Sequence, residues 1–372
     1  GDYLRDMLGQ IVPHQSPAHL QVNRNKRSVT LDVRADEGRE LFWTLLEQAD
    51  VFVDGLLSGA CDRMGIGYDE QRRRKPSIVY CHCSGFGATG PYAAIPTHGQ
   101  MMNAAAAGVA LTLDADGFVR QHPNDELMFG TSGGGDGTTA AAVHAALRTV
   151  AALVRRDRTG AGAFLDAAGA DAVIAQGWIG AVYGWNEQRL TSRTGLRPRG
   201  TAPFSSARYQ YYATSDARFV LFCAIEPKFW RRFCAAIERP DLVGADADGG
   251  APVEFAHGDD ALRRELQQVF ATRTQQEWVN VAIEHDVPIG PAHQGVAALL
   301  DDDHLRSRDI VVEGEHPVAG PFKYVGSPVI VDGERFEVQR PAPGLGQHTD
   351  EVLAEIGIDA DEIARLRAAG VV

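Results

Sequence analysis

The sequence predicts an α/β fold of two domains, and three features lead to that prediction. Strand-like and helix-like segments alternate through the first half, a polar arginine-rich stretch interrupts them, and a different pattern follows. Such alternation favours a parallel sheet with crossover helices, which binds ligands at the carboxyl ends of its strands. A length of 372 residues also suits two domains, at roughly 100 to 200 residues per domain.

Hydrophobic periodicity locates the elements of the first half. The expected strands are 28–33, 51–53, 77–83 and 163–167, and the expected helices are 35–48, 138–156 and 170–183. In the alanine-rich second helix, larger apolar residues recur at spacings of three and four, which predicts that they face a core. These residues are Val143, Leu147, Val150, Leu153 and Val154. Gly160 and Gly162 are expected to end the helix.

The second half is expected to form a small α+β domain and then return to the first domain. Residues 186–200 are polar and contain Gly195, Pro198 and Gly200, which indicates a linker. The elements expected beyond it are a hairpin of 209–214 and 219–224, helices at 228–237, 260–271, 275–284, 296–300 and 349–356, and short strands at 323–325 and 336–338. The expected divisions are 1–187 for the first part of a large domain, 188–200 for a linker, 201–287 for a small domain and 288–372 for a return segment that completes the large domain.

Composition argues against several classes of protein. A formal charge of −13 disfavours nucleic-acid and anionic-membrane partners, which are held by basic surface. No run approaches the roughly 20 apolar residues of a membrane span. The opening Gly1-Asp2-Tyr3 does not resemble a signal peptide, so a cytoplasmic location is expected. Five cysteines, an odd number, indicate reduced thiols rather than a disulfide framework.

The string Cys81-His82-Cys83 suggests a metal site at first sight. Structural zinc usually takes two or more residues between its cysteines and a second pair of ligands elsewhere. Neither is present, and no helix presents two histidines at a metal-binding spacing. The sequence therefore predicts no metal.

Two charged features suit chemistry. The stretch 23–27 contains Arg24, Lys26 and Arg27, a local cluster that fits the phosphates of a small polyanion or else forms a solvated basic turn. Asp136 follows Ser132-Gly133-Gly134-Gly135 and precedes the alanine-rich helix, where N–H groups would stabilise its negative charge. That position fits a reacting carboxylate, and it equally fits a simple helix N-cap.

In their order along the chain, several strings together resemble the class III CoA-transferases, the CaiB/BaiF family that also includes formyl-CoA transferases and α-methylacyl-CoA racemases. The strings are Asn23-Arg24-Asn25-Lys26-Arg27-Ser28, Asp62-Arg63-Met64-Gly65, Tyr80 to Gly87, Thr89-Gly90-Pro91-Tyr92, Arg158-Thr159-Gly160, Pro317 to Gly320 and Arg340 to Thr349. The resemblance covers nearly the whole chain.

The resemblance implies a Rossmann-like large domain built from both ends of the chain, a small middle domain and an interlocked homodimer. It implies an acyl-CoA and a carboxylic acid acceptor as partners, with the coenzyme A thioester as substrate and no prosthetic group. Family members also begin with a strand, a loop and a helix that normally precede a Gly-Asp like Gly1-Asp2. The chain is therefore expected to be a fragment or one part of a split or fused protein.

Carried over residue by residue, the resemblance makes Asp136 the nucleophile that attacks the thioester. It places Lys26 near phosphate, Arg63 and Met64 beside coenzyme A, and the loop Ser84-Gly85-Phe86-Gly87 beneath the pantetheine arm. The Asn-Phe-like pair of the transferases is replaced here by Gly55 and Leu56, so one contact is expected to be lost. Residues 97–129 and the small domain are expected to line the acyl pocket.

Two alternatives stay open. The first is a racemase-type proton transfer by His98 and Asp136, because His98 occupies the place of the racemase histidine and a histidine pKa suits such work. In the racemases an aspartate follows that histidine, whereas Gly99 follows here, and a loop histidine often only makes hydrogen bonds. Glu226 lies in a racemase-like segment but is expected to be structural. The second alternative is a non-catalytic subunit or fragment.

Overall fold

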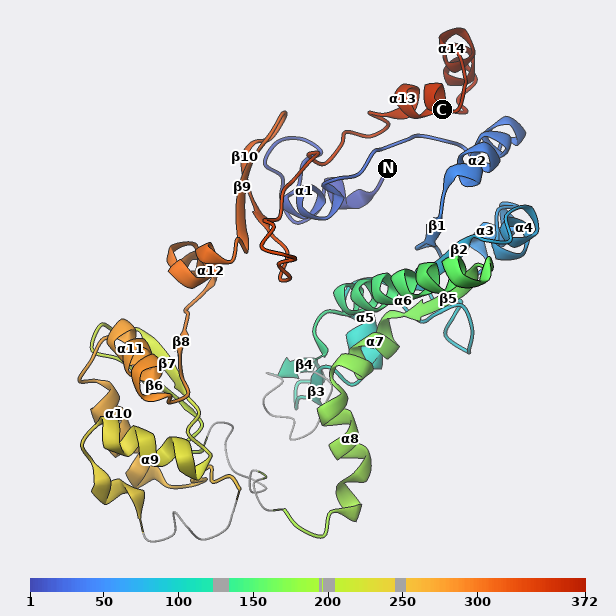
Figure 1. Cartoon of the computed structure of the whole chain (residues 1–372). Helices are drawn as coiled ribbons and strands as arrows, with labels where there is room; N and C mark the ends of the chain where they lie inside the picture. The colour runs from blue at the N-terminus through green and yellow to red at the C-terminus, as the bar shows by residue number, and fades with distance from the viewer. Residues whose placement is uncertain (123–133, 194–195, 197–204, 245–251) are drawn as a thin grey trace. The chain divides into compact units, whose positions relative to one another are not determined.

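The structure is a computed structural model that describes residues 1–122, 134–193, 196, 205–244 and 252–372. It divides into two compact units (Figure 1). The first consists of residues 1–187 together with 310–372, and the second of residues 188–309.

The first unit contains the predicted alternation of strands and helices. Its strands are β1 (Val51–Asp54), β2 (Val79–Ser84), β3 (Ala110–Leu113), β4 (Val119–His122), β5 (Ala163–Ala168), β9 (Val311–His316) and β10 (Gly320–Val325). Its α-helices are α1 (Pro17–Asn23), α2 (Asp36–Gln48), α3 (Ala60–Arg63), α4 (Tyr68–Arg74), α5 (Met101–Ala105), α6 (Gly137–Thr159), α7 (Gly169–Gln176), α8 (Trp178–Asn186), α13 (Thr349–Glu355) and α14 (Ala360–Ala368). The α/β class is thereby confirmed.

A parallel sheet in the order β1-β2-β5 organises this unit. Its register aligns Phe52, Tyr80 and Phe164 in one row, and the rings of this row pack on one another. Tyr68 of α4 covers this face. Because side chains alternate along a strand, Cys83 points to the opposite face, where it packs against Ala140 and Ala141 of α6. Helices therefore cover both faces of the sheet.

The prediction that the larger apolar residues of α6 face a core is wrong for four of the five, whereas Leu153 is half-buried. Val143, Leu147, Val150 and Val154 are all more than half exposed. The buried side is instead made by alanines, Ala140, Ala141, Ala145 and Ala152. Small side chains let the helix lie close to β2 and β5 (Figure 1), so the larger residues are left on the outer face.

The end of α6 and its apolar composition can also be compared with what the sequence predicts. Gly160 ends the helix in the left-handed conformation (φ 72°), as predicted. By length and composition alone, α6 could also cross a membrane, which differs from the expectation that no run is apolar enough. Its contacts with β2, β5 and α7 are those of a helix laid along a sheet.

The two ends of the chain meet within this unit. Asn25 and Arg340 exchange two hydrogen bonds, and the Ser28 amide donates to His348 Nδ1 at 3.1 Å. Residues 28–33 were expected to form a strand, and this is wrong. The Thr30 N–H bonds to the Thr349 side chain and the Asp32 N–H to the Val371 carbonyl, so no neighbouring strand is involved.

The second unit has its own antiparallel sheet, in the order β6-β7-β8. Its elements are β6 (Gln210–Ala213), β7 (Phe219–Phe222), α9 (Pro227–Ala236), α10 (Asp260–Phe270), α11 (Gln275–His285), β8 (Ile289–Ala292) and α12 (Asp303–Ser307). The predicted hairpin and the helices α9, α10 and α11 are confirmed. Trp230, Phe233 and Trp278 fill a core that is closed to solvent.

Further differences from the expected elements concern β8, the helix at 170–183 and the C-terminal region. The strand β8 pairs with β7, so residues 288–309, assigned to the return segment from the sequence, lie in the second unit. The helix expected at 170–183 is split into α7 and α8 at Gly177. No strand forms at 336–338, and α14 was not expected. Part of the expected linker, at 194–195 and 197–200, lies outside the described residues.

Candidate functional site at the carboxyl edge of the parallel sheet

Asp136 lies at the carboxyl edge of the parallel sheet. The helix α6 leads into β5 and runs antiparallel to it, so the helix begins where β2 and β5 end. Asp136 Oδ1 accepts the N–H groups of Thr138 and Thr139, both at 3.0 Å. The residue is exposed, and Oδ2 makes no hydrogen bond to any described residue. One oxygen therefore caps the helix while the other stays available.

The turn that holds Asp136 is closely packed. A Cβ atom on Gly134 would lie 2.1 Å from the Val173 carbonyl oxygen, and one on Gly137 would lie 2.7 Å from the Met102 Cβ. Gly135 has a φ of 73°, which favours glycine. The sequence signal of three glycines is thus explained by close approach, although Ser132 and Gly133 lie outside the described residues.

Asn103 of α5 was missed by the sequence analysis. Its Nδ2 donates to the Gly135 carbonyl at 2.6 Å, and its Oδ1 accepts the Gly137 N–H at 3.0 Å. One half-buried amide therefore binds the peptide groups on both sides of Asp136. A single polar residue in an alanine-rich stretch was the available signal, but its pairing with residues 32 and 34 positions away needed tertiary structure.

The loop Ser84-Gly85-Phe86-Gly87 is joined to the Asp136 turn. The Ala170 N–H donates to the Gly85 carbonyl at 3.0 Å, and Gly169 packs against Met102, the same residue that Gly137 touches. Within the loop, the Gly87 N–H donates to Ser84 Oγ at 3.1 Å. Phe86 packs against the exposed Tyr92, with ring centroids 5.6 Å apart. These predicted residues therefore lie at the same edge of the sheet as Asp136.

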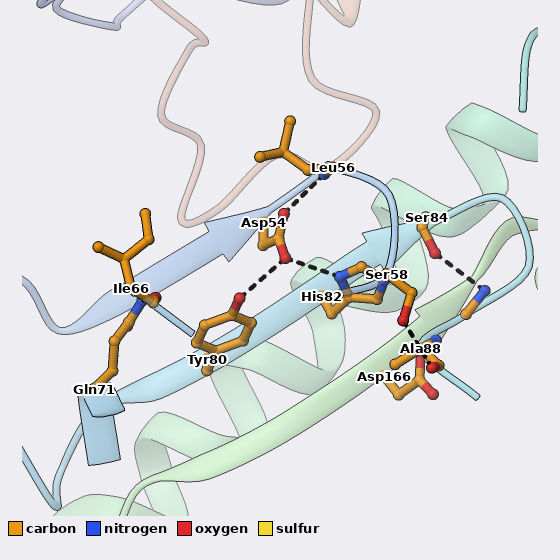
Figure 2. Close-up of polar contacts among 11 residues, drawn as sticks. Asp54, Leu56, Ser58, Ile66, Gln71, Tyr80, His82, Ser84, Ala88 and Asp166 are labelled. Carbon is orange, nitrogen blue, oxygen red and sulfur yellow. Dashed lines mark hydrogen bonds and ion pairs between the residues drawn. The ribbon is translucent and has the colours of Figure 1, made fainter. Parts of the chain in front are cut away.

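A buried acid–imidazole pair lies on the other face of the sheet (Figure 2). Asp54 Oδ2 accepts from His82 Nδ1 and from the Tyr80 hydroxyl, each at 3.0 Å. Asp54 Oδ1 accepts the Leu56 N–H at 2.8 Å. His82 and Asp54 are only 3% and 5% exposed, so solvent does not screen the pair. The sequence analysis considered His82 only as a metal ligand.

The pair shifts both pKa values in the directions expected of an ion pair. The hydrogen bond to Asp54 raises the pKa of His82, against the opposing effect of burial. Burial alone would raise the pKa of Asp54, but the bonds from His82, Leu56 and Tyr80 together hold it below its ordinary value. A charged pair is thus favoured over a neutral one.

Two loops are tied together above this pair. Ser58 Oγ donates to the Ala88 carbonyl at 2.9 Å, and the Ala88 N–H donates to Asp166 Oδ1 at 2.7 Å (Figure 2). Asp166 is the register partner of His82 on β5. The loop after β1, the loop after β2 and the end of β5 are therefore linked by side-chain hydrogen bonds.

His98 contacts Tyr3 rather than Asp136 in the part of the chain that the structure describes. The Tyr3 hydroxyl lies 3.4 Å from His98 Nδ1, and both residues are exposed. Among the described residues, His98 and Asp136 make no hydrogen bond to each other, and a racemase would need only that both reach the α-carbon of the substrate.

The cationic candidates lie at separate places. Lys26 is exposed and donates to Asn23 Oδ1 at 3.1 Å. Its neighbour Arg27 is engaged by Glu351 and Glu355, so less positive charge is available there than the sequence suggested. Arg63 is exposed at the end of α3 and pairs with no described residue. Met64 packs its side chain into the core beneath α2 and β2.

No group of three metal-binding side chains occurs among the residues that the structure describes. In Cys81-His82-Cys83 the alternation of β2 sends His82 to one face and the two cysteines to the other. Burial also raises the pKa of Cys81 and of Cys83, which disfavours thiolates.

A parallel α/β sheet with glycine-rich loops and an exposed carboxylate at its carboxyl edge is the arrangement of a ligand-binding α/β enzyme. The chain belongs to CoA-transferase family III, which it matches over residues 1–349.

Relatives agree with this family, and solved structures agree with the fold. A formyl-CoA:oxalate CoA-transferase of Rhodopseudomonas palustris (strain BisB18) is 28% identical over all of this chain and 88% of its own length. An acyl-CoA transferase of Fusarium pseudograminearum (strain CS3096) is 30% identical over 94% of this chain and 74% of its own. Rv3272 from Mycobacterium tuberculosis superposes with a TM-score of 0.66 at 22% identity, covering 94% of this chain and 87% of its own. A CAIB/BAIF family protein from Brucella suis gives 0.64 at 21%, covering 92% and 84%.

Proposed function

We propose that the chain transfers coenzyme A between carboxylic acids through a covalent intermediate on Asp136. The observation that carries this proposal is the exposed Oδ2 of Asp136, which bonds to no described residue and lies at the start of α6 beside a closely packed glycine turn. Two N–H groups of the helix start donate to the other oxygen of this carboxylate, and a carboxylate can act as the nucleophile in covalent catalysis.

The proposed reaction balances without an added proton or oxidant. Asp136 Oδ2 attacks the thioester carbonyl of the donor, the C–S bond breaks, and an aspartyl mixed anhydride and a CoA thiolate form. The thiolate then attacks the aspartyl carbonyl, which releases the donor acid and leaves an aspartyl-CoA thioester. The acceptor carboxylate repeats the sequence in reverse, regenerating Asp136 and forming the new acyl-CoA.

The loops at the sheet edge are proposed to bind coenzyme A. The backbone of Ser84-Gly85-Phe86-Gly87 is proposed to support the pantetheine arm. The glycines let this loop pack closely on its own neighbours, because a Cβ atom on Gly85 would lie 2.3 Å from Thr97 Oγ1 and Gly87 has a φ of 81°. Two cations are proposed to bind phosphates through charge-assisted hydrogen bonds. They are Arg63, whose side chain pairs with no described residue, and Lys26, which donates a hydrogen bond to Asn23.

Small dicarboxylic or monocarboxylic acids are the first substrates to test. Several relatives that match all of this chain are formyl-CoA:oxalate CoA-transferases at 27–28% identity. We infer formyl-CoA as the first donor and oxalate as the first acceptor, because both fit a family that moves coenzyme A between carboxylates.

We also infer a Rossmann-like large domain and an interlocked homodimer. The parallel order β1-β2-β5 with helices on both faces supports the first inference. Exposed apolar residues support the second, since α8 leaves Trp178, Ile179 and Trp185 more than half exposed. A mass of about twice 40.1 kDa by light scattering is expected, and a monomer at micromolar concentration would contradict the dimer.

The test of the reaction is chromatography of the acyl-CoA products. With formyl-CoA and oxalate, or another acid pair from a panel, coenzyme A should appear on the acceptor only when both substrates are present. Uptake of deuterium at the α-carbon of a 2-methylacyl-CoA without any acceptor would replace the proposal with the racemase. Neither signal across the panel would favour a non-catalytic chain.

A further inference from the structure

The buried pair of Asp54 and His82 lies where the two proposed coenzyme A loops begin (Figure 2). Asp54 is the last residue of β1, and its carboxylate holds both the Leu56 N–H of the following loop and His82 of β2. Two residues beyond His82, β2 ends at Ser84, the first residue of the glycine-rich loop. One carboxylate therefore fixes the starts of both loops against each other.

A second set of hydrogen bonds joins the two loops to each other and to β5. Ser58 of the first loop donates to the Ala88 carbonyl of the second, and Ala88 donates to Asp166 on β5. Asp54, His82 and Asp166 lie in one row across the sheet by register. A shift of His82 relative to Asp54 would thus be passed to both loops at once.

The charged groups around His82 are mostly negative, which would affect the binding of an anionic ligand. The charged groups that face it are Asp54 from β1, Asp62 from α3 and Asp166 from β5, and Tyr80 and Cys61 lie beside the same carboxylate. Three carboxylates surround one imidazole. If the imidazole loses its proton, the local charge becomes more negative by one unit next to the loops that would receive a polyanion.

One atom of His82 is unpartnered. Its Nε2 is buried and makes no hydrogen bond to any described residue, while Nδ1 is committed to Asp54. A neutral ring would leave a buried acceptor at Nε2, and a charged ring would leave a buried donor near several carboxylates. The surroundings favour the charged ring.

We propose that His82 is a positioning residue for coenzyme A, and that its imidazolium, held on Asp54, keeps the loops 55–59 and 84–88 in their binding conformation. This inference rests on the proposed function, because it presumes that these loops bind coenzyme A. Coenzyme A affinity and protonation of His82 are then coupled, so each strengthens the other.

The experiment is calorimetric titration of coenzyme A into wild type, His82→Asn and Asp54→Asn at pH 6, 7, 8 and 9. Dividing each variant's Kd by the wild-type value at the same pH removes the ligand's own ionisation. For His82→Asn the ratio should be about tenfold at pH 6 and fall towards one at pH 9. In Asp54→Asn, Kd should begin to rise at a lower pH than in the wild type, because His82 without its carboxylate partner loses its proton at a lower pH.

The matched control is His293→Asn, which breaks another histidine–aspartate pair of the same 3.0 Å length, with Asp302 in the second unit. Its Kd ratio should not vary with pH. Circular dichroism will show that each variant folds. For the wild type alone, titration in buffers of different ionisation enthalpy should show proton uptake on coenzyme A binding at pH 8.

The outcomes separate the two proposals. Wild-type binding with a His82→Asn ratio that stays constant from pH 6 to pH 9 would overturn the inference alone, as would proton release in place of uptake. Absence of coenzyme A binding by the wild type at every pH would overturn the proposed function and the inference with it.

Discussion

The two faces of β2 differ in how they hold the site. On the α6 face, the Asp136 turn is fixed by alanines, glycines and the neutral amide of Asn103. On the other face, the loops are fixed by buried charges, Asp54 and His82, with Asp166 beside them. The proposed chemical step therefore has a neutral support, and the proposed binding loops have a titratable one.

This difference separates catalysis from binding as functions of pH. The described residues that support Asp136 are alanines, glycines and Asn103, none of which changes charge near neutrality, so the turnover number should vary little with pH there. Coenzyme A binding should carry the pH dependence instead. The following predictions test this separation on each face of β2, with the larger effects first.

Asp136→Ala should have the largest effect on the α6 face. Loss of the nucleophile should lower CoA transfer at least about 1,000-fold. The helix also loses its cap, at a cost of about 1 kcal/mol in the free energy of unfolding. Product chromatography and urea unfolding measure the two effects.

Its matched control is Asp359→Ala, because Asp359 caps α14 through the same kind of bond to a backbone N–H. This variant should lose similar stability and keep full transfer activity. Equal activity losses in the two variants would reduce Asp136 to a cap.

Asp54→Asn should have the largest effect on the other face. Breaking the buried pair should cost about 3 kcal/mol of unfolding free energy near pH 6. The pKa of His82 is raised in the folded state, so its contribution is complete below its ordinary value of 6.5 and is lost as pH rises through the folded pKa. The difference from wild type should therefore shrink between pH 7 and pH 9, as measured by urea unfolding.

A difference that stayed constant over that range would mean that Asp54 does not raise the pKa of His82 in the folded protein. The double variant with His82→Asn should cost less than the sum of the two single variants, because both remove the same contact.

Asn103→Ala should lower the turnover number about 10- to 100-fold, because the peptide groups beside Asp136 lose their common partner. KM for the acyl-CoA should stay within about twofold, since the binding loops are held from the other face. Asn280→Ala, which removes a surface bond to Gln276, is the control and should change neither constant. A rise in KM with the turnover number unchanged would contradict a positioning role for Asn103.

Arg63→Ala should have the smallest effect. Loss of one exposed phosphate contact should weaken coenzyme A binding about fivefold at low salt, and less at high salt. Titration at two salt concentrations checks this. An effect that did not depend on salt would place Arg63 away from the phosphates.

The comparison also shows what the sequence could and could not predict. Strands, helices and the Asp136 cap followed from local patterns, because periodicity and capping act over a few residues. The orientation of α6 could not be predicted in this way. A stripe of large apolar residues suggests a buried face, whereas in α6 the alanine face is the buried one. Asn103 and Asp54 could not be found, because their partners are distant in sequence. Lys26 and Arg63 came from the family resemblance, and their roles stay predictions.

The measurement that tests the central claim most directly is mass spectrometry of the protein after incubation with formyl-CoA and hydroxylamine quenching, for wild type and Asp136→Ala. We predict a peptide containing Asp136 that carries a CoA thioester, or its hydroxamate after quenching, and no such peptide in the variant. An adduct on another residue, or turnover that persists in Asp136→Ala, would contradict it.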